Sequence, residues 1–141
     1  MAQSVTFAED VAPLRFENFV MFLDHTSIAP GERRDLFYTL AKIGVTDAVM
    51  GCNAVVGDSF KLLGSIEERA KDCEEARSWG IRPHFSYWDK PGDDDTQMRV
   101  MGELARAAQP ASIIADVEGN TLADSVRVDH SKRAARYAQW V

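Results

Sequence analysis

The sequence contains little cysteine: Cys52 and Cys73 are the two thiols among 141 residues. One falls in an expected strand and the other in an expected helix, and their spacing is not that of a zinc site. We therefore expect two buried free thiols, no resident metal and no other cofactor. Such thiols fit a reducing compartment.

Long apolar runs and dense basic segments are also missing. No run approaches the roughly 20 apolar residues of a membrane-spanning helix, and the acidic start MAQSVTFAEDVAP lacks the basic and apolar parts of a signal peptide. The formal net charge is -6, and the basic segments GERRDLF and SKRAARYAQW are mixed or short. We expect no membrane and no nucleic acid among the partners, because phosphate binding relies on clustered Lys and Arg. Synthesis is expected in the cytoplasm, and the final location is open.

What the sequence does contain is an ordinary globular balance, with 45% apolar and 27% charged residues. Apolar runs of strand length alternate with segments of helical period. Strands are expected to begin near residues 19, 46, 81 and 111, a spacing of about 30 residues that is typical of consecutive βα units with parallel strands. Helices are expected near residues 31–43, 65–80, 93–108 and 122–140.

Three local patterns refine these boundaries. Ser65 and Glu68 have the spacing of a capping box. The acidic triplet at 93–95 is expected to favour the start of a helix rather than to bind a metal. Pro83 cannot donate to a hydrogen-bond ladder, so the first residues of the third run are expected only to approach the sheet.

The repeated unit predicts an α/β fold in which residues 18–141 form a single (βα)4 domain, half of a TIM-type barrel, after a leader of unknown role at 1–17. The inner face of four such strands, with Val20, Phe22 and Ile114, would lie open to water. Exposing these side chains costs several kcal/mol at about 25 cal/mol per Å² of apolar area. This face must be covered by the missing half of a longer protein, by another half barrel in a homo-oligomer, or by the helices of an open, doubly wound sheet.

Polar and aromatic residues collect at the expected carboxyl ends of the strands, where parallel βα proteins place their chemistry. No glycine-rich phosphate loop and no nucleophile elbow accompanies them. Acidic and aromatic residues together favour a carbohydrate ligand, because sugars stack on aromatic rings and glycosidic bonds are cleaved by paired carboxyl groups. The residues in question are Asp24 with His25, Asn53 beside Cys52, then Tyr87, Trp88 and Asp89, and finally Asp116 with Glu118.

Asp116 and Glu118 are two positions apart, so on a strand they share one face about 7 Å from each other. Repulsion and partial burial push one carboxyl toward its protonated form, which makes an acid and a base from similar groups. We expect Glu118 to be the general acid. Asp116 would raise its pKa and orient it, or hold a substrate acetamido group, and Asp24 would be a base or second carboxylate.

The residues expected to bind substrate around these carboxylates are Asn53, Tyr87, Trp88 and Asp89. Plainer explanations exist for several of these positions. Asp89 also suits a turn, Tyr87 and Trp88 also suit a cover over the end of the core, and Asp24 also suits a helix cap.

The strand ends FLD, HFSYWD and IIADVEG resemble those of the barrel-shaped lysozymes of glycoside hydrolase family 25 and, more loosely, those of chitinase-like barrels. The resemblance covers about residues 19–141. It implies that the fourth-strand D-x-E supplies the catalytic acid, Glu118, with Asp116 as its companion, and that Asp24 matches the first-strand aspartate. The family's first-strand opening, of Gly-Ile-Asp-Val-Ser type, reads FLDHTS here, and its later-strand aspartate has no counterpart in four units.

Three hypotheses of function follow. The first is a lysozyme-like glycosidase acting on a peptidoglycan or chitin-type polysaccharide, and the second is a non-catalytic structural or interaction module of a phage or cell-wall assembly. The third is a metal-dependent hydrolase that uses Asp24, His25 and Asp116. Against the third, His25 and His84 also suit structural histidines, because they have no fixed ligand spacing.

Overall fold

The computed structural model describes residues 19–23, 28–54, 57, 59–90 and 93–116. Strands and helices alternate along this part of the chain. The strands are β1 (Val20–Leu23), β2 (Asp47–Gly51), β3 (Arg82–Trp88) and β4 (Ser112–Asp116). The helices are α1 (Arg33–Lys42), α2 (Ile66–Ser78) and α3 (Asp94–Ala108).

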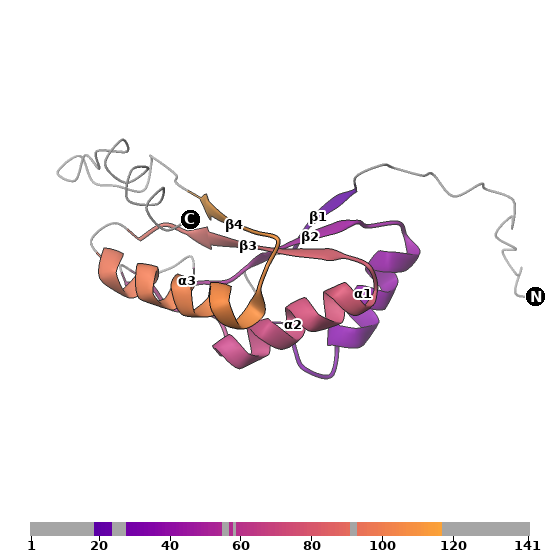
Figure 1. Cartoon of the computed structure of the whole chain (residues 1–141), viewed down its shortest axis with the longest axis horizontal. Helices are drawn as coiled ribbons and strands as arrows, with labels where there is room; N and C mark the ends of the chain where they lie inside the picture. Colours follow the sequence, from indigo (N-terminus) through magenta and orange to yellow (C-terminus); the bar gives the residue numbers. More distant parts are fainter. Residues whose placement is uncertain (1–18, 24–27, 55–56, 58, 91–92, 117–141) are drawn as a thin grey trace, which may run out of the picture.

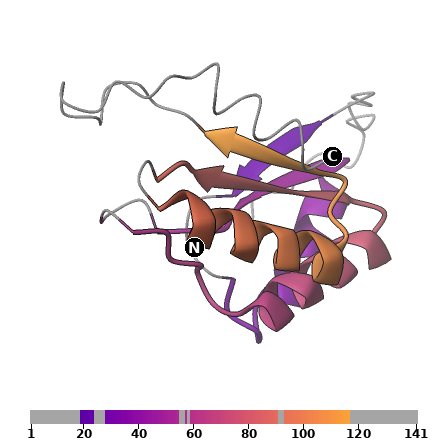
Figure 2. The same cartoon turned by 60° about the vertical axis from the view of Figure 1, so that its left-hand side comes forward.

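The four strands form one parallel sheet in the order β1-β2-β3-β4. All three helices pack on the same face of this sheet (Figures 1 and 2). The expected α/β fold of consecutive parallel βα units is therefore confirmed. A doubly wound sheet would carry helices on both faces, whereas α1, α2 and α3 share one. The sheet is not closed into a barrel by the residues described.

The core lies between the sheet and the helices. Alternate residues of the central strands point into it, and each helix contributes the apolar stripe that its period predicts. We call the side of the sheet that faces the helices the covered face and the opposite side the open face. The main core side chains are Ala48, Met50, Cys52, Phe85 and Tyr87 from the strands and their ends, and Phe37, Leu40, Cys73, Ala76, Met101, Leu104 and Ala108 from the helices.

The predicted capping box begins α2. The Ser65 hydroxyl accepts a hydrogen bond from the Glu68 backbone N–H at 3.1 Å, and the Glu68 carboxylate accepts one from the Ser65 backbone N–H at 2.9 Å. The two side chains therefore satisfy backbone donors that would otherwise have no partner at the helix start. This sequence prediction is confirmed.

The acidic triplet does mark the start of α3, although Asp93 at the N-cap makes no side-chain cap hydrogen bond. Its carboxylate instead accepts the Phe60 backbone N–H at 2.7 Å. Hydrogen bonds from the Thr96 side chain and from Phe60 lower the pKa of Asp93. The aspartate therefore ties the loop after β2 to the start of α3.

The prediction for Pro83 is wrong, because this residue lies inside β3 and is in register with Ala48 of β2. Its carbonyl accepts a hydrogen bond from Ala111 N at 2.7 Å. In a strand of a parallel sheet, the backbone N–H and C=O of one residue point to the same neighbouring strand. The ring nitrogen of Pro83 therefore faces the chain just before β4, which begins at Ser112, and no hydrogen bond of the ladder is lost.

Both cysteines are free and fully buried, as expected. Burial raises the pKa of the Cys52 thiol and of the Cys73 thiol to about 12 in each case. The two residues contribute to the core as small apolar side chains.

A buried ion cluster joins α1 to α2. Asp72 is completely buried and pairs with Arg33 across the two helices, and its second oxygen lies 2.9 Å from Arg69 Nη2. Desolvation raises the pKa of Asp72, and the two guanidinium groups oppose that shift. Arg69 is itself 1% exposed, so this carboxylate is the counter-charge of two largely buried cations.

Candidate functional site

The carboxyl edge of the sheet brings Asp116 and Trp88 together. They are register partners at the ends of β4 and β3, and the backbone N–H of Asp89 donates to the Asp116 carbonyl at 3.0 Å. Alternation along each strand places both side chains on the open face. Neighbouring strands are about 4.8 Å apart, so a carboxylate and an indole stand side by side at this edge.

Three of the predicted site residues lie outside the described residues. These are Asp24, His25 and Glu118. The roles that the sequence gives them, including the general acid, stay predictions.

Asn53 extends the pairing of β2 with β3 through its side chain. Its Nδ2 donates to the Trp88 carbonyl at 2.9 Å, and its Oδ1 accepts the Trp88 backbone N–H at 2.7 Å. The residue has no exposed surface. The amide thus acts as one further backbone unit of β2 and positions Trp88, and the predicted contact of Asn53 with substrate stays a prediction.

Tyr87 and Asp89 alternate with Trp88 and lie below the edge on the covered face. Tyr87 is 3% exposed and packs edge-on against the ring of Phe60, with the centroids 6.1 Å apart. Asp89 is 5% exposed and accepts a hydrogen bond from Gln97 Nε2 of α3 at 3.0 Å. Packing and turn formation, the plainer explanations of these two residues, account for their positions. Their predicted contact with substrate stays a prediction.

The turn after β3 is held by Gln97 and Lys90, which sequence reasoning missed. The Gln97 side chain accepts the Lys90 backbone N–H at 3.1 Å and donates to the Lys90 carbonyl at 3.2 Å. Lys90 is 5% exposed, and its ammonium donates to the Gly57 carbonyl at 2.8 Å. These contacts fix the direction in which the chain leaves Trp88.

A second polar group, also missed, crosses the open face nearer the amino edge. We call Asp47, Arg82, His84 and Ser112 the Asp47 cluster. Arg82 Nε lies 2.9 Å from Asp47 Oδ1, and Arg82 Nη2 donates to Asp47 Oδ2 at 2.9 Å. His84 Nε2 lies 2.9 Å from Asp47 Oδ1, and His84 Nδ1 lies 2.7 Å from the Ser112 hydroxyl.

The electrostatics of the cluster centre on Asp47, which is 5% exposed. Burial opposes ionisation of this carboxyl, but hydrogen bonds from Arg82, Thr46 and His84 and the charge of Arg82 outweigh it and lower the pKa of Asp47 to about 2. One ring nitrogen of His84 contacts the Asp47 carboxylate and the other contacts the Ser112 hydroxyl. Both ring nitrogens are thus engaged, and His84 has the structural role that the sequence suggested for it.

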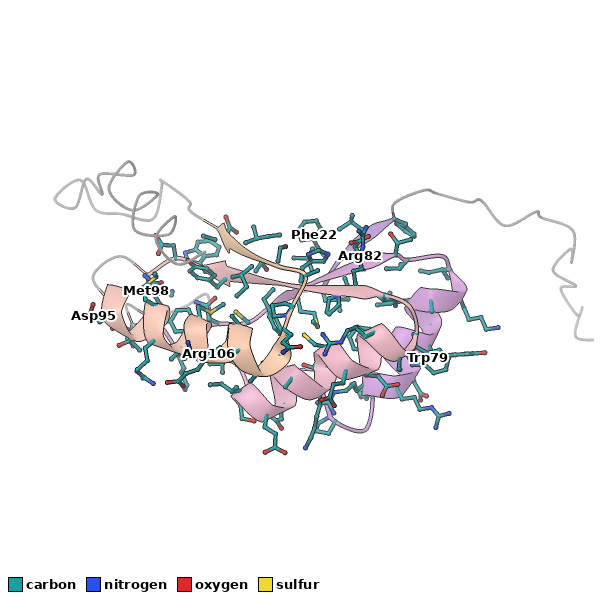
Figure 3. All side chains as sticks on the ribbon, in the orientation of Figure 1. Phe22, Trp79, Arg82, Asp95, Met98 and Arg106 are labelled. Carbon is teal, nitrogen blue, oxygen red and sulfur yellow. The ribbon has the colours of Figure 1, made fainter. Side chains whose placement is uncertain are left out.

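Apolar side chains surround the cluster on the open face. Phe22 is 71% exposed, Val20 46% and Ile114 41%, although all three lie on strands of the sheet. Figure 3 shows Phe22 and Arg82 on the side of the sheet away from the helices, opposite Arg106 and Trp79. The expectation that Val20, Phe22 and Ile114 share an uncovered face is therefore confirmed for the part of the chain described.

Two further findings on the described ranges concern metal binding and membrane-spanning helices. Within them, no three His, Cys, Asp or Glu side chains are grouped so as to hold a metal ion. Within the same ranges, no helix has the length and hydropathy needed to cross a membrane. The metal-dependent alternative depends on Asp24 and His25, which lie outside those ranges.

The resemblance to family 25 lysozymes stays a prediction from the three strand-end motifs of the sequence. Comparison of the sequence with protein-family models and with curated proteins gives no match.

Proposed function

We propose that the chain is a glycoside hydrolase-like domain that acts on a peptidoglycan or chitin-type polysaccharide at the carboxyl edge of its sheet. The observation that supports this most directly is the pairing of Trp88 with Asp116 on the open face. An indole offers a flat apolar surface for a sugar ring, and an adjacent carboxylate suits its hydroxyl or acetamido groups. In parallel βα proteins this edge is where substrates bind.

In this proposal Glu118 is the general acid, because the residue two positions after Asp116 in an extended chain shares its face. Asp116 orients that acid and raises its pKa, and Trp88 binds the sugar next to the bond to be cleaved. Asn53 supports the site from below by fixing the Trp88 backbone on both sides. Asp24 is the proposed second carboxylate.

Activity on purified cell walls tests the proposal. We expect the full chain to clear a peptidoglycan suspension or to release reducing sugar from chitin-type oligomers. Glu118→Gln should abolish this activity and Asp116→Asn should reduce it at least about 100-fold, since general acid catalysis contributes 10²- to 10⁴-fold. Glu74→Gln, a matched change at an exposed position on α2, should leave it unchanged. Retained activity in Glu118→Gln would refute the assignment of the acid.

The open face favours a second candidate, a non-catalytic structural or interaction module of a phage or cell-wall assembly. An exposed apolar sheet face is typical of a surface that contacts another protein. Sedimentation with insoluble peptidoglycan separates the two functions. A module would bind without releasing sugar, and Trp88→Ala would weaken binding, whereas an enzyme would release sugar from the same material.

A further inference from the structure

The open face of the four-stranded sheet exposes large apolar side chains. Phe22 of β1 and Ile114 of β4 are 71% and 41% exposed, and they lie on the two outer strands. Val49, between them on β2, is only 3% exposed, so the middle of this face is already packed. The water-exposed apolar side chains are thus concentrated toward both edges of the sheet.

Neither outer strand has a second partner strand within the described residues, so both edges can extend the sheet. Among the residues described, β1 pairs with β2 alone and β4 pairs with β3 alone. All four strands run in one direction, with the helices on one face (Figure 2). A second sheet of the same kind can therefore continue both edges without reversing any strand.

We propose that a second copy of this chain covers the open face, with β4 of each copy beside β1 of the other, so that two copies close an eight-stranded parallel barrel. A two-fold axis along the barrel makes both joins at once, which gives a closed dimer rather than an open chain of copies. Eight strands are also the number at which a barrel interior is just filled by side chains. Phe22, Val20 and Ile114 of both copies then become interior residues.

The Asp47 cluster is compatible with burial in such an interior. Asp47 already pairs with Arg82 and contacts His84 in its own copy, so the carboxylate and the guanidinium of the cluster are each other's counter-charge. Burying it against a second copy leaves no unpaired charge, and an unpaired charge is what makes burial of ionic groups costly. The face thus needs apolar cover rather than a countercharge from its partner.

The chain's own residues 117–141 are one competing occupant of the open face. The sequence predicts a helix over 122–140, which would be the return helix of a fourth βα unit. Consecutive units of one hand place such helices on the face that α1, α2 and α3 already cover. In our proposal the second copy, and not this helix, therefore covers the open face.

The dimer also bears on the carboxyl edge. It would place Trp88 and Asp116 of both copies around one mouth. The later-strand carboxylate that the four βα units of one copy do not supply would then come from the other copy. This last step rests on the proposed function, whereas the closure of the barrel does not.

Light scattering on the full chain tests the closure. We expect a mass of twice 15.7 kDa. Phe22→Asp and Ile114→Asp should each give a monomer, because each places a charge in the new interior. Ile43→Asp, the same kind of change at a 52% exposed position at the end of α1, should stay dimeric. A wild-type mass of 15.7 kDa at micromolar concentration, or one that rises past two copies, overturns the inference.

Hydrogen exchange identifies the interface of any dimer. Backbone amides of β1 and β4 should be protected in the wild type and lose protection in Phe22→Asp, while those of α2 stay protected. A dimer whose edge strands exchange freely, or one that Phe22→Asp leaves intact, overturns the barrel. A closed dimer with no glycosidase activity would refute the proposed function alone, and full activity in the monomeric variants would refute the shared mouth.

Discussion

Asp47 and Arg82 face each other in register on β2 and β3 and are joined by two contacts of 2.9 Å, one to each carboxylate oxygen. This two-point contact is the geometry in which Arg binds a carboxylate most strongly. Because Arg82 is 62% exposed on its side chain, solvent screens part of the attraction. Protonation of Asp47 in acid should therefore lower the free energy of unfolding.

We predict that Asp47→Asn destabilises the protein at pH 7 by about 1 to 2 kcal/mol. The pKa of Asp47 is lowered from 3.8 to about 2 in the folded state. Its contribution is therefore fully present above pH 4 and is lost as the pH falls through 2. Urea unfolding at pH 7, 4 and 2 should show the difference between wild type and variant shrinking with acid. Asp95→Asn, at an exposed position on α3, should change stability by less than about 0.5 kcal/mol at every pH.

Asn53→Ala should cost about 2 to 3 kcal/mol, because it removes two hydrogen bonds and leaves the Trp88 N–H and carbonyl without their partners. Urea unfolding gives the free energy, and hydrogen exchange gives the location. The Trp88 amide should lose protection while the amides of α2 keep theirs. Unchanged protection of Trp88 would contradict the role of Asn53 as an extension of β2.

Asp72→Asn should be the most damaging of these substitutions, at about 3 to 5 kcal/mol, because it leaves Arg33 and Arg69 buried without a counter-charge. Glu67→Gln is the matched control. Its carboxylate pairs with Lys71 at 2.6 Å on the surface of α2, and both side chains are more than half exposed. Such pairs contribute about 0.5 kcal/mol or less. Equal effects of the two changes in urea unfolding would show that Asp72 is not the centre of the helix contact.

The two thiols should react slowly in the native protein. Burial raises the pKa of Cys52 and of Cys73 to about 12, and the thiolate is the reactive form. With a disulfide reagent at pH 8 we expect rates at least about 100-fold below those of the unfolded chain. Rapid labelling of either cysteine under native conditions would contradict its burial.

The order of strands and helices could be predicted from the sequence because hydrophobic period and turn residues are local signals. The expected strand starts at 19, 46, 81 and 111 lie next to Val20, Asp47, Arg82 and Ser112. Pro83 was misjudged because its effect depends on which neighbour its nitrogen faces. That neighbour is fixed by the register of β3 against β4, which is not a local property.

In the candidate site, too, local sequence signals predict some features and not others. The side-by-side placement of Trp88 and Asp116 follows from counting along parallel strands. The partners of Asn53 and Asp89 could not be predicted, because they come from β3 and α3 at a distance set by the fold. The Asp47 cluster did have a local signal. Polar residues at 82, 84 and 86 alternate with buried ones in β3, which is the pattern of a strand with one open face.

Two contacts link the loop after β2 to the turn after β3: Lys90 to the Gly57 carbonyl, and Asp93 to the Phe60 amide. The ring of Phe60 also packs against the ring of Tyr87 on β3. The start of α3 therefore holds the backbone of Phe60, and β3 holds its side chain. We expect these two contacts to couple the motions of the two loops. The two loops should open as a single cooperative unit. Trp88 and its surroundings should then rearrange only when both loops open together.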